Sequence, residues 1–542
     1  MKRYRLLPLL LLSVAAMAQT PIERDVVVES VYNPTVGTSV KRFFLPGEAD
    51  NDATPLPIVY ATTANRLRSF TVELLSAEGL ELEKTKPYPG YFRMGFGTGS
   101  NVDGTAAYRL QAGEKNAFDA GVTFNGWNRM LALPGDDGNT YQSSRADLDS
   151  HLDFIRTESE HSQLRAGIDY GRYSFNAPLL EGHPLPVGTV APQVANLIGG
   201  RVQWNGQEGN YSDNPLDLGF NLGYHRWNLT EGHPFGEHNT HGDLDVSIGL
   251  NFEDLGYLDV AIDNDLLLYG RHNELYSKPY YSFGLNPRWY YGNAMWTVVL
   301  GLHADAQSEG MPKVQVSPDC RISMQPVDRL KLTLITAGGR NLNDFRTLYT
   351  AFPLWDADGA LRNAYTHLDS RLQGDLRIVD GLLVSLWGGY RMVTDALFAT
   401  CDVASHMLSA TLCNEDATAK AFGLQASWTY KDIVRVGLDA HHDIWKVSDT
   451  SLLQFVPKTY AEFNGRVRII KGLHADTGFR FATFGDGTGS PMLDLCVGAD
   501  YVLNDRVSLF LNGQNLLNRH WYDAPALPTQ GIRGRLGATV KL

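Results

Sequence analysis

Apolar and polar residues alternate with a period of two along most of the chain. In the segment 243–252, every second residue is apolar: Leu244, Val246, Ile248, Leu250 and Phe252. Successive side chains of a strand point to opposite faces, so this segment predicts a strand with one apolar and one polar face. The same alternation recurs at 434–441, 473–481 and 533–542. It predicts an all-β protein.

The connections between the alternating segments are short and long in turn. Short turn signals include Gly292-Asn293, Asp380-Gly381 and Lys471-Gly472, and long polar segments lie at 129–144, 176–193, 344–366 and 395–420. From residue 91 to residue 542 the pattern gives about 22 strands, and an even number with short turns at one end is typical of transmembrane up-and-down antiparallel β-barrels. A soluble sandwich or propeller also alternates, but the connection lengths favour the barrel.

Composition supports the barrel and excludes a helical membrane protein. The chain has 542 residues, 43% hydrophobic residues, 11% aromatic residues, 53 glycines and a mean hydropathy of -0.22. After the first 18 residues, no uncharged apolar run approaches the roughly 18 residues that a membrane helix needs. Two aromatic pairs, Trp289 with Tyr291 and Trp428 with Tyr430, precede tight turns. Such pairs are expected in the aromatic girdle of a barrel.

The first 18 residues have the pattern of a signal peptide. Lys2, Arg3 and Arg5 precede an apolar stretch, and Ala16-Met17-Ala18 is a small-x-small cleavage site. We therefore expect cleavage after Ala18 and a location in the outer membrane of a Gram-negative bacterium. The chain's net charge is -13, and removing the three basic residues makes it more negative. Nucleic-acid binding is thus not expected, since it needs clustered basic residues.

The C-terminal residues resemble a known family signature. An apolar strand precedes Asn515-Leu516-Leu517-Asn518-Arg519, and Trp521-Tyr522, a loop and Arg533-Gly534-Arg535-Leu536-Gly537 follow. This order resembles the C-terminal signature of TonB-dependent receptors. The resemblance implies a 22-stranded barrel, uptake of a small ligand and partnership with the periplasmic protein TonB. The chain departs from the family in ending on Leu542, where an aromatic residue is usual.

A second departure concerns the segment 19–90, which we expect to be periplasmic or lumenal. It is too short for the full plug domain that the family carries ahead of its barrel, and it contains seven prolines between Pro21 and Pro89. Asp25, Val26, Val27, Val28 and Glu29 resemble a TonB box, an extended stretch that adds a strand to its partner. The alternatives are a β-prone tether or an abbreviated plug packed in the lumen.

The polar parity of the strands predicts which residues face the lumen. It assigns five aspartates and three arginines to the interior: Asp243, Asp245, Asp259, Asp263, Asp439, Arg435, Arg533 and Arg535. An excess of carboxylates would weakly favour cations. The alternative is that these side chains only solvate a polar interior.

Two further groups of residues suggest specific chemistry. Cys401 and Cys413 share a long polar segment and could close an extracellular disulfide. Glu-Gly-His-Pro occurs at 181–184 and again at 231–234, and His233, His238 and His241 could hold a divalent metal or be solvated loop residues. The sequence contains no nucleophile elbow, P-loop, H-E-x-x-H or dinucleotide fingerprint, so we expect neither an enzyme nor a cofactor.

Two functions of different classes remain. The first is an outer-membrane transport barrel that takes up or passes a small hydrophilic nutrient. The second is a structural or docking barrel of a multiprotein outer-membrane complex, whose pore is filled by a partner such as a periplasmic protein or a surface lipoprotein. The sequence names neither a substrate nor a partner.

Overall fold

The computed structural model describes most of the chain from Tyr88 to Leu542. The described ranges are 88–132, 140–159, 162–176, 179–180, 193–205, 216–229, 236–248, 256–269, 278–308, 313–354, 361–404, 407–431, 433–485 and 490–542. The predicted signal peptide, the TonB-box-like residues 25–29 and nearly all of the segment 19–90 lie outside these ranges.

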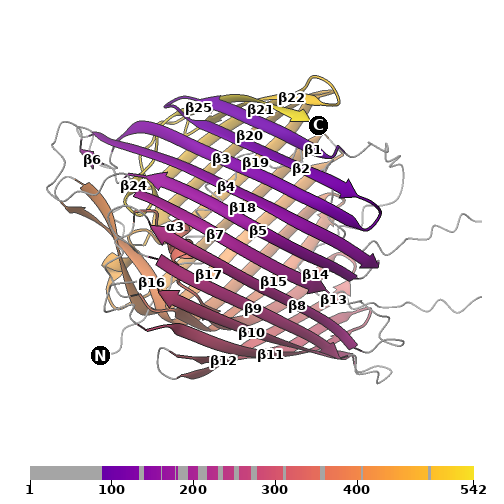
Figure 1. The fold of residues 1–542 in the computed structure, drawn as a ribbon. Coiled ribbons are helices and arrows are strands. Elements are labelled where there is room, and N and C mark those ends of the chain that lie inside the picture. The colour runs from indigo at the N-terminus through magenta and orange to yellow at the C-terminus, as the bar shows by residue number, and fades with distance from the viewer. Residues whose placement is uncertain are drawn as a thin grey trace, which may run out of the picture.

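The described strands form a closed antiparallel barrel (Figure 1). Its sheet has 23 strands, and one of them, β6, has two residues and lies outside the ring, so 22 strands form the wall. The ring closes where β1 pairs with β25. The predicted strand number and fold class are confirmed. The ring strands are β1 (Gly90–Gly97), β2 (Val102–Ala112), β3 (Asn116–Ala132), β4 (Thr140–Ser159), β5 (Ser162–Phe175), β7 (Gln193–Asn205), β8 (Leu216–Leu229), β9 (Gly236–Ile248), β10 (Tyr257–Tyr269), β11 (Tyr280–Gly292), β12 (Trp296–Gln307), β13 (Val314–Val327), β14 (Leu330–Asn341), β15 (Ala364–Val379), β16 (Leu382–Ala404), β17 (Met407–Tyr430), β18 (Val434–Lys446), β19 (Pro457–Ile470), β20 (Leu473–Phe484), β21 (Met492–Val502), β22 (Val507–Gln514) and β25 (Arg533–Lys541).

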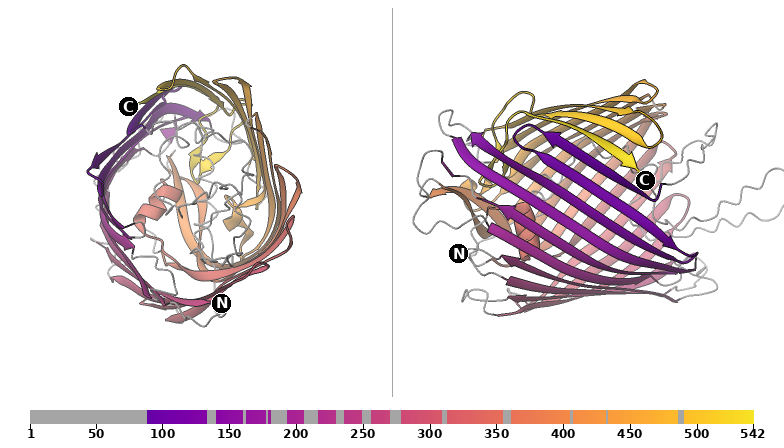
Figure 2. Two further views of the ribbon diagram at one scale, coloured as in Figure 1. Left: turned by 90° about the vertical axis from the view of Figure 1, so that its right-hand side faces the viewer. Right: turned by 45° about the horizontal axis from the view of Figure 1, so that its top comes forward.

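Short elements interrupt the connections at one end of the barrel. They are β6 (Leu179–Leu180), the helix α3 (Phe345–Ala351), the 3-10 helix η3 (Thr450–Leu453), β23 (Tyr522–Ala524) and β24 (Leu527–Pro528). Figure 2, looking along the barrel, shows α3 inside the ring of strands. No helix of the described residues is long and apolar enough to cross a membrane.

The wall has the reverse of a soluble protein's polarity. In β11, Ser282 and Asn286 are buried, whereas Phe283 and Leu285 are 44% and 38% exposed. The period of a strand places the two pairs on opposite faces, with the polar face toward the lumen. Large apolar side chains are exposed in the same way on strands throughout the ring, for example Ile168, Leu372 and Leu536. An apolar outer face around a polar lumen is the pattern of a transmembrane barrel.

The short turns gather at one end of the barrel, as the sequence predicts. Gly381 has φ +82 in the turn between β15 and β16, and a Cβ there would lie 2.2 Å from the Thr429 carbonyl oxygen. Only glycine adopts this conformation without strain. At the same end, the rings of Trp289 and Tyr291 lie 5.9 Å apart and those of Trp428 and Tyr430 lie 6.1 Å apart. The start of β1 and the end of β25 lie at this end of the barrel too, because the Leu542 N–H donates to the Gly90 carbonyl at 2.8 Å.

One predicted long loop is wrong. The described residues of the segment 395–420 belong to strands instead, because β16 and β17 continue as a hairpin from Ala396↔Glu415 to Ala404↔Met407. The ladder shifts register between Val393 and Ala396, and Asp395 has φ +52. This bulge bends the hairpin, and beyond it Ala396, Leu397 and Phe398 are each 0% exposed. Burial of consecutive residues on both faces hides the alternation, so the sequence reads as a loop.

Candidate ligand site beneath the loop end of the barrel

The β16–β17 hairpin reaches the opposite wall of the barrel. We call the residues 396–404 and 407–415 the bridging hairpin. Near its tip Met407 pairs with Leu179 of β6, and Leu180 of β6 pairs with Tyr141 of β4. Around the ring, nine strands separate β17 from β4 on one side and eleven on the other. The hairpin therefore spans the mouth at the loop end, where Figure 1 shows it projecting past the wall.

Helix α3 folds into the mouth and is fixed at its N-terminus. Asp344 is the N-cap, and its side chain accepts a hydrogen bond from the Thr347 N–H at 3.0 Å. His225 Nε2 of β8 lies 3.0 Å from the other carboxylate oxygen of Asp344. Burial opposes ionisation of Asp344, but His225 and Thr347 outweigh it and lower the pKa of this carboxyl. The N-cap residue Asp344 thus ties α3 to the barrel wall.

Apolar packing joins α3 to the wall and to the bridging hairpin. The ring of Phe345 meets that of Trp227 of β8 at 5.6 Å, and the ring of Tyr349 meets that of Phe175 of β5 at 5.1 Å. One buried cluster contains these residues together with residues of the hairpin, of the segment around η3 and of the β23–β24 loop: Phe398, Leu412, Leu453, Phe455, Val456 and Ala526. We call this cluster the cap. It covers the loop end of the lumen with packed side chains.

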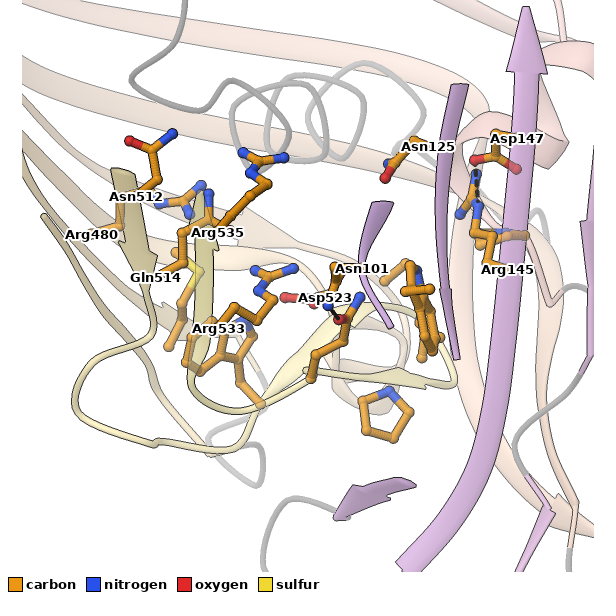
Figure 3. Close-up of a pocket in the computed structure, with 18 of the residues that line it drawn as sticks. Asn101, Asn125, Arg145, Asp147, Arg480, Asn512, Gln514, Asp523, Arg533 and Arg535 are labelled. Carbon is orange, nitrogen blue, oxygen red and sulfur yellow. Dashed lines mark hydrogen bonds and ion pairs between the residues drawn. The ribbon is translucent and has the colours of Figure 1, made fainter. Parts of the chain in front are cut away.

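A polar cavity of about 260 Å³ lies between the cap and the wall (Figure 3). Strands from both sides of the ring closure line it, along with the β23–β24 loop and α3. Its charged lining residues are Arg145, Asp147, Arg480, Asp523, Arg533 and Arg535, and its neutral polar ones include Asn101, Asn125, Asn512 and Gln514. Trp127 and Trp521 form part of its wall. The cavity combines four guanidinium groups with amides and indole rings.

Three of the four arginines hold carboxylates. Arg145 Nε lies 2.7 Å from Asp147, whose other oxygen accepts the Tyr349 hydroxyl at 3.4 Å. Arg535 Nη1 lies 3.0 Å from Asp103, and Arg480 pairs with the fully buried Asp494. These pairs fix the arginines against the wall. Arg533 differs, because it forms no ion pair within the part of the chain that the structure describes, and its Nε is buried without a hydrogen-bond partner.

Within the cavity lining, Asp523 is the acidic residue nearest to the guanidinium of Arg533. Burial raises the pKa of the Asp523 carboxyl, and the charges of Arg533 and Arg480 oppose the rise. In Figure 3 Asp523 and Arg533 lie side by side in the cavity. No ion pair joins them, so Asp523 moderates the field of Arg533 without occupying its donors.

A second polar cluster lies on another part of the barrel wall, and its charged groups are paired with one another. Arg340 of β14 donates to Asp265 and Asp305 at 2.8 Å each and pairs with Asp263. The Tyr365 hydroxyl donates to Asp305 at 3.1 Å. Arg340 is 6% exposed, so this group is a buried network between β10, β12 and β14. It ties together three strands on one side of the ring.

The sequence singled out part of both clusters. Asp263 belongs to the Arg340 network, and Arg533 and Arg535 line the cavity. Sequence reasoning missed Arg340, Asp305, Arg145 and Asp523. Arg340 follows Gly338-Gly339, where a register shift between Ala337 and Gly339 breaks the alternation, so its parity could not be read from the pattern.

The other candidates lie elsewhere. Asp259 is 7% exposed and its carboxylate lies 3.9 Å from Arg288. Asp439 accepts a hydrogen bond from Gln425 at 2.8 Å, and Arg435 is exposed near the short-turn end of β18. Asp243 and Asp245 lie in β9, in register with Asp263 and Ala261. The structure does not bring this set together into one site.

The predicted disulfide does not form. Cys401 and Cys413 are both thiols, and they lie on neighbouring strands at different levels of the ladder. Cys401 is in register with Ala410, and Cys413 is in register with Phe398. An offset of three residues separates the thiols along the strands and turns them to opposite faces, so a bond between them would violate disulfide geometry. The sequence cannot show this, because it does not reveal the register.

The histidine hypothesis falls mostly outside the described residues. His233 lies beyond the described ranges, and His238 and His241 lie in β9. Among the described residues, no group of three or more His, Cys, Asp or Glu side chains is arranged to hold a metal ion.

Comparisons with known proteins support the barrel. No family model matches the chain, and no curated protein matches its sequence. Among solved structures, a mutant of the ferric enterobactin receptor PfeA from Pseudomonas aeruginosa has a TM-score of 0.63 at 9% identity, covering 84% of this chain and 80% of that one. The siderophore receptor PirA from Acinetobacter baumannii has a TM-score of 0.63 at 10% identity, with coverage of 84% and 80%.

A third solved structure gives the same result. The FrpB iron transporter from Neisseria meningitidis has a TM-score of 0.62 at 12% identity, covering 85% of this chain and 82% of that one. At such identities the likeness concerns the fold. The chain therefore has the transmembrane β-barrel fold of these receptors, as its C-terminal residues implied.

Proposed function

We propose that this protein is an outer-membrane transport barrel that captures a small hydrophilic nutrient at its loop end and passes it toward the periplasm. The observation that carries the proposal is a polar cavity enclosed between the barrel wall and a packed cap at the mouth. An open pore has no need of a cap. A receptor needs a site that solute enters before the barrel conducts it.

The size of the barrel supports this proposal. A barrel of 22 strands encloses a space too wide for its own wall side chains to fill. The bridging hairpin and α3 obstruct that space at the loop end. A solute that reaches the periplasm then has to enter beside the cap, where the cavity lies, and part of the obstruction has to move. This is the behaviour of a gated receptor.

The proposal includes energy coupling through the N-terminal segment. Asp25 to Glu29, outside the described residues, would add a strand to TonB or a comparable periplasmic partner. Both ends of the barrel's strand ring lie at the short-turn end. This arrangement lets a segment that precedes β1 lie on the periplasmic side.

Planar-bilayer recording tests the gated barrel. We expect the wild-type protein to show little steady conductance, and a variant with 402–409 replaced by a tight turn to show a large one. The described residues of this range, 402–404 and 407–409, pair with each other in the bridging hairpin. A large steady conductance of the wild type would contradict the gated receptor and support a passive pore. A silent barrel that copurifies with one protein stoichiometrically, and whose hairpin deletion stays silent, would support the docking barrel instead.

Uptake by cells tests the coupling. Deleting residues 25–29 should abolish energy-dependent uptake and leave the amount of barrel in the outer membrane unchanged. A deletion of the same length elsewhere in 19–87 is the matched control. Undiminished uptake after the first deletion would reject the TonB-box hypothesis.

A further inference from the structure

The cavity beneath the cap has one arginine, Arg533, that forms no ion pair among the described residues, although Asp523 lies beside it. Asp147, Asp494 and Asp103 pair with Arg145, Arg480 and Arg535 respectively. Each of these pairs is neutral as a unit. Arg533 takes part in no such pair among the described residues, and Asp523 beside it does not occupy its donors, so the guanidinium of Arg533 is the one in the lining that a ligand can pair with.

The guanidinium of Arg533 also has an unused donor. Its Nε is buried and lacks a hydrogen-bond partner. A buried donor left unpaired costs about 1–3 kcal/mol, and more when the group is charged. A carboxylate or phosphate in the cavity would bind the guanidinium of Arg533 with two parallel hydrogen bonds, because both groups match the planar fork of arginine.

The backbone positions Arg533 at this place. It is the first residue of β25, in register with Gln514 of β22, and the next residue, Gly534, donates its N–H to the Thr98 hydroxyl at 3.1 Å. In Figure 3 the Arg533 side chain extends into the cavity between Arg535 and Asn101. The side chain therefore starts from a fixed strand, and a ligand would meet it without rearrangement of the wall.

The neutral lining suits a small polar ligand. Asn101 donates to Gln530 at 3.1 Å on one side, and the amides of Asn125 and Gln514 line the cavity beyond it. Amide groups can accept hydroxyl hydrogens or donate to ligand oxygens. Trp127 and Trp521 provide flat apolar walls. A compact anion with hydroxyl or amide groups would use all three features.

Resting on the transport function proposed above, we propose that this cavity binds a small anionic solute bearing carboxylate or phosphate groups, with Arg533 as the residue that selects for negative charge. This differs from the weak preference for cations expected from the lumenal carboxylates. Those carboxylates that the structure describes are largely held by arginines, such as Asp263 and Asp305 by Arg340.

The test uses the full-length protein in detergent micelles with citrate and inorganic phosphate as separate probes. Trp127 and Trp521 lie in the cavity wall, so their fluorescence should report binding. Arg533→Gln removes the charge and keeps most of the side chain. Arg468→Gln is the matched control, because Arg468 is exposed on β19 near the short-turn end and does not line the cavity. Glycerol serves as an uncharged polyol probe.

We expect saturable binding of at least one anion, with no response to glycerol. Arg533→Gln should weaken binding roughly ten- to hundred-fold, since one charge-assisted pair is lost, and Arg533→Lys should restore part of it. Arg468→Gln should bind as the wild type does. A response to citrate alone identifies a carboxylate site and a response to phosphate alone a phosphate site.

Two outcomes would overturn the inference: equal affinity of Arg533→Gln and Arg468→Gln for the anion, or no saturable response of the wild type to either probe. Both would leave the transport proposal standing if the bilayer and uptake measurements support it. If the bilayer and uptake measurements contradict the gated receptor while the anion still binds, the transport proposal fails and the anion site stands. Folding of each variant is checked by its heat-modifiable mobility in gels.

Discussion

Met407, near the tip of the bridging hairpin, pairs through its backbone with Leu179 of β6. Strand β6 is itself paired with β4, which belongs to the far wall of the barrel mouth. Strand pairing normally joins neighbours around a ring. Here a bent hairpin carries one strand over the opening, and a two-residue strand receives it. The mouth is thereby closed by hydrogen bonds of the backbone as well as by side-chain packing in the cap.

The first prediction concerns this bridge. In a variant with Leu179→Cys and Met407→Cys, oxidation should form a disulfide, because residues directly opposed in an antiparallel pair come close enough for one. The bond should hold the hairpin across the mouth and block uptake, and reduction should restore uptake. Mobility in non-reducing gels reports the bond. Each single substitution serves as the control, and uptake that continues through the oxidised barrel would show that the hairpin does not need to move.

A second prediction concerns Asp344, which caps α3. Asp344→Ala removes the hydrogen bond to the Thr347 N–H and should destabilise the cap by about 1 kcal/mol. Asp344→Asn can keep a capping hydrogen bond but loses the charge beside His225, so it should cost less. Thermal unfolding of the barrel in detergent at neutral pH gives both values. Equal stability of all three proteins would show that the cap does not depend on this residue.

The pH dependence of the same residue has a definite sign. The folded protein lowers the pKa of Asp344 below its ordinary value, so the carboxylate stabilises the folded state above the unfolded pKa of about 3.9. This contribution is lost as the pH falls through the lowered folded-state pKa. The stability difference between wild type and Asp344→Asn should therefore shrink on acidification. A difference that grows toward acid pH would contradict the assignment.

The wall of the barrel could be predicted from the sequence because its signal is repeated in every strand. Apolar side chains such as Phe283 and Leu285 share one parity over many segments, and the turn residues around Gly381 mark the boundaries. Each strand obeys the same physical rule: one face meets lipid and the other meets water. The count of strands and the placing of the short turns followed from that rule alone.

The cap and the cavity could not be predicted in the same way. Their residues come from segments far apart in the chain, and the cap residues Phe398, Phe345 and Leu453 are buried by each other rather than by lipid. No period marks such contacts. Bulges at Asp395 and Gly339 change the parity locally. The lumenal parity of Arg533 could be predicted from the final strand, but its lack of an ion pair depends on where Arg145, Arg480 and Arg535 find their carboxylates.

A third prediction concerns Arg340 and its three carboxylates. Arg340→Met would leave Asp263, Asp265 and Asp305 close together in the lumen without a cation, which typically costs about 3–5 kcal/mol for a buried network. Arg340→Lys keeps the charge but cannot reproduce three separate donor directions, so its stability should lie between those of the wild type and Arg340→Met. Urea unfolding in lipid or detergent measures the differences. A loss below about 1 kcal/mol would indicate that water solvates these carboxylates in the lumen.

The last prediction concerns Cys401 and Cys413. In the folded barrel they should stay reduced even under an oxidant, because an offset of three residues on neighbouring strands turns them to opposite faces. Alkylation after denaturation without reductant should modify all four cysteines of the chain. Ala410→Cys is the positive control, since residue 410 lies directly opposite Cys401 and the new pair should oxidise readily. A bond between Cys401 and Cys413 in the wild type would mean that β16 and β17 pair in a different register, and the bridging hairpin would then end at a different residue than Met407.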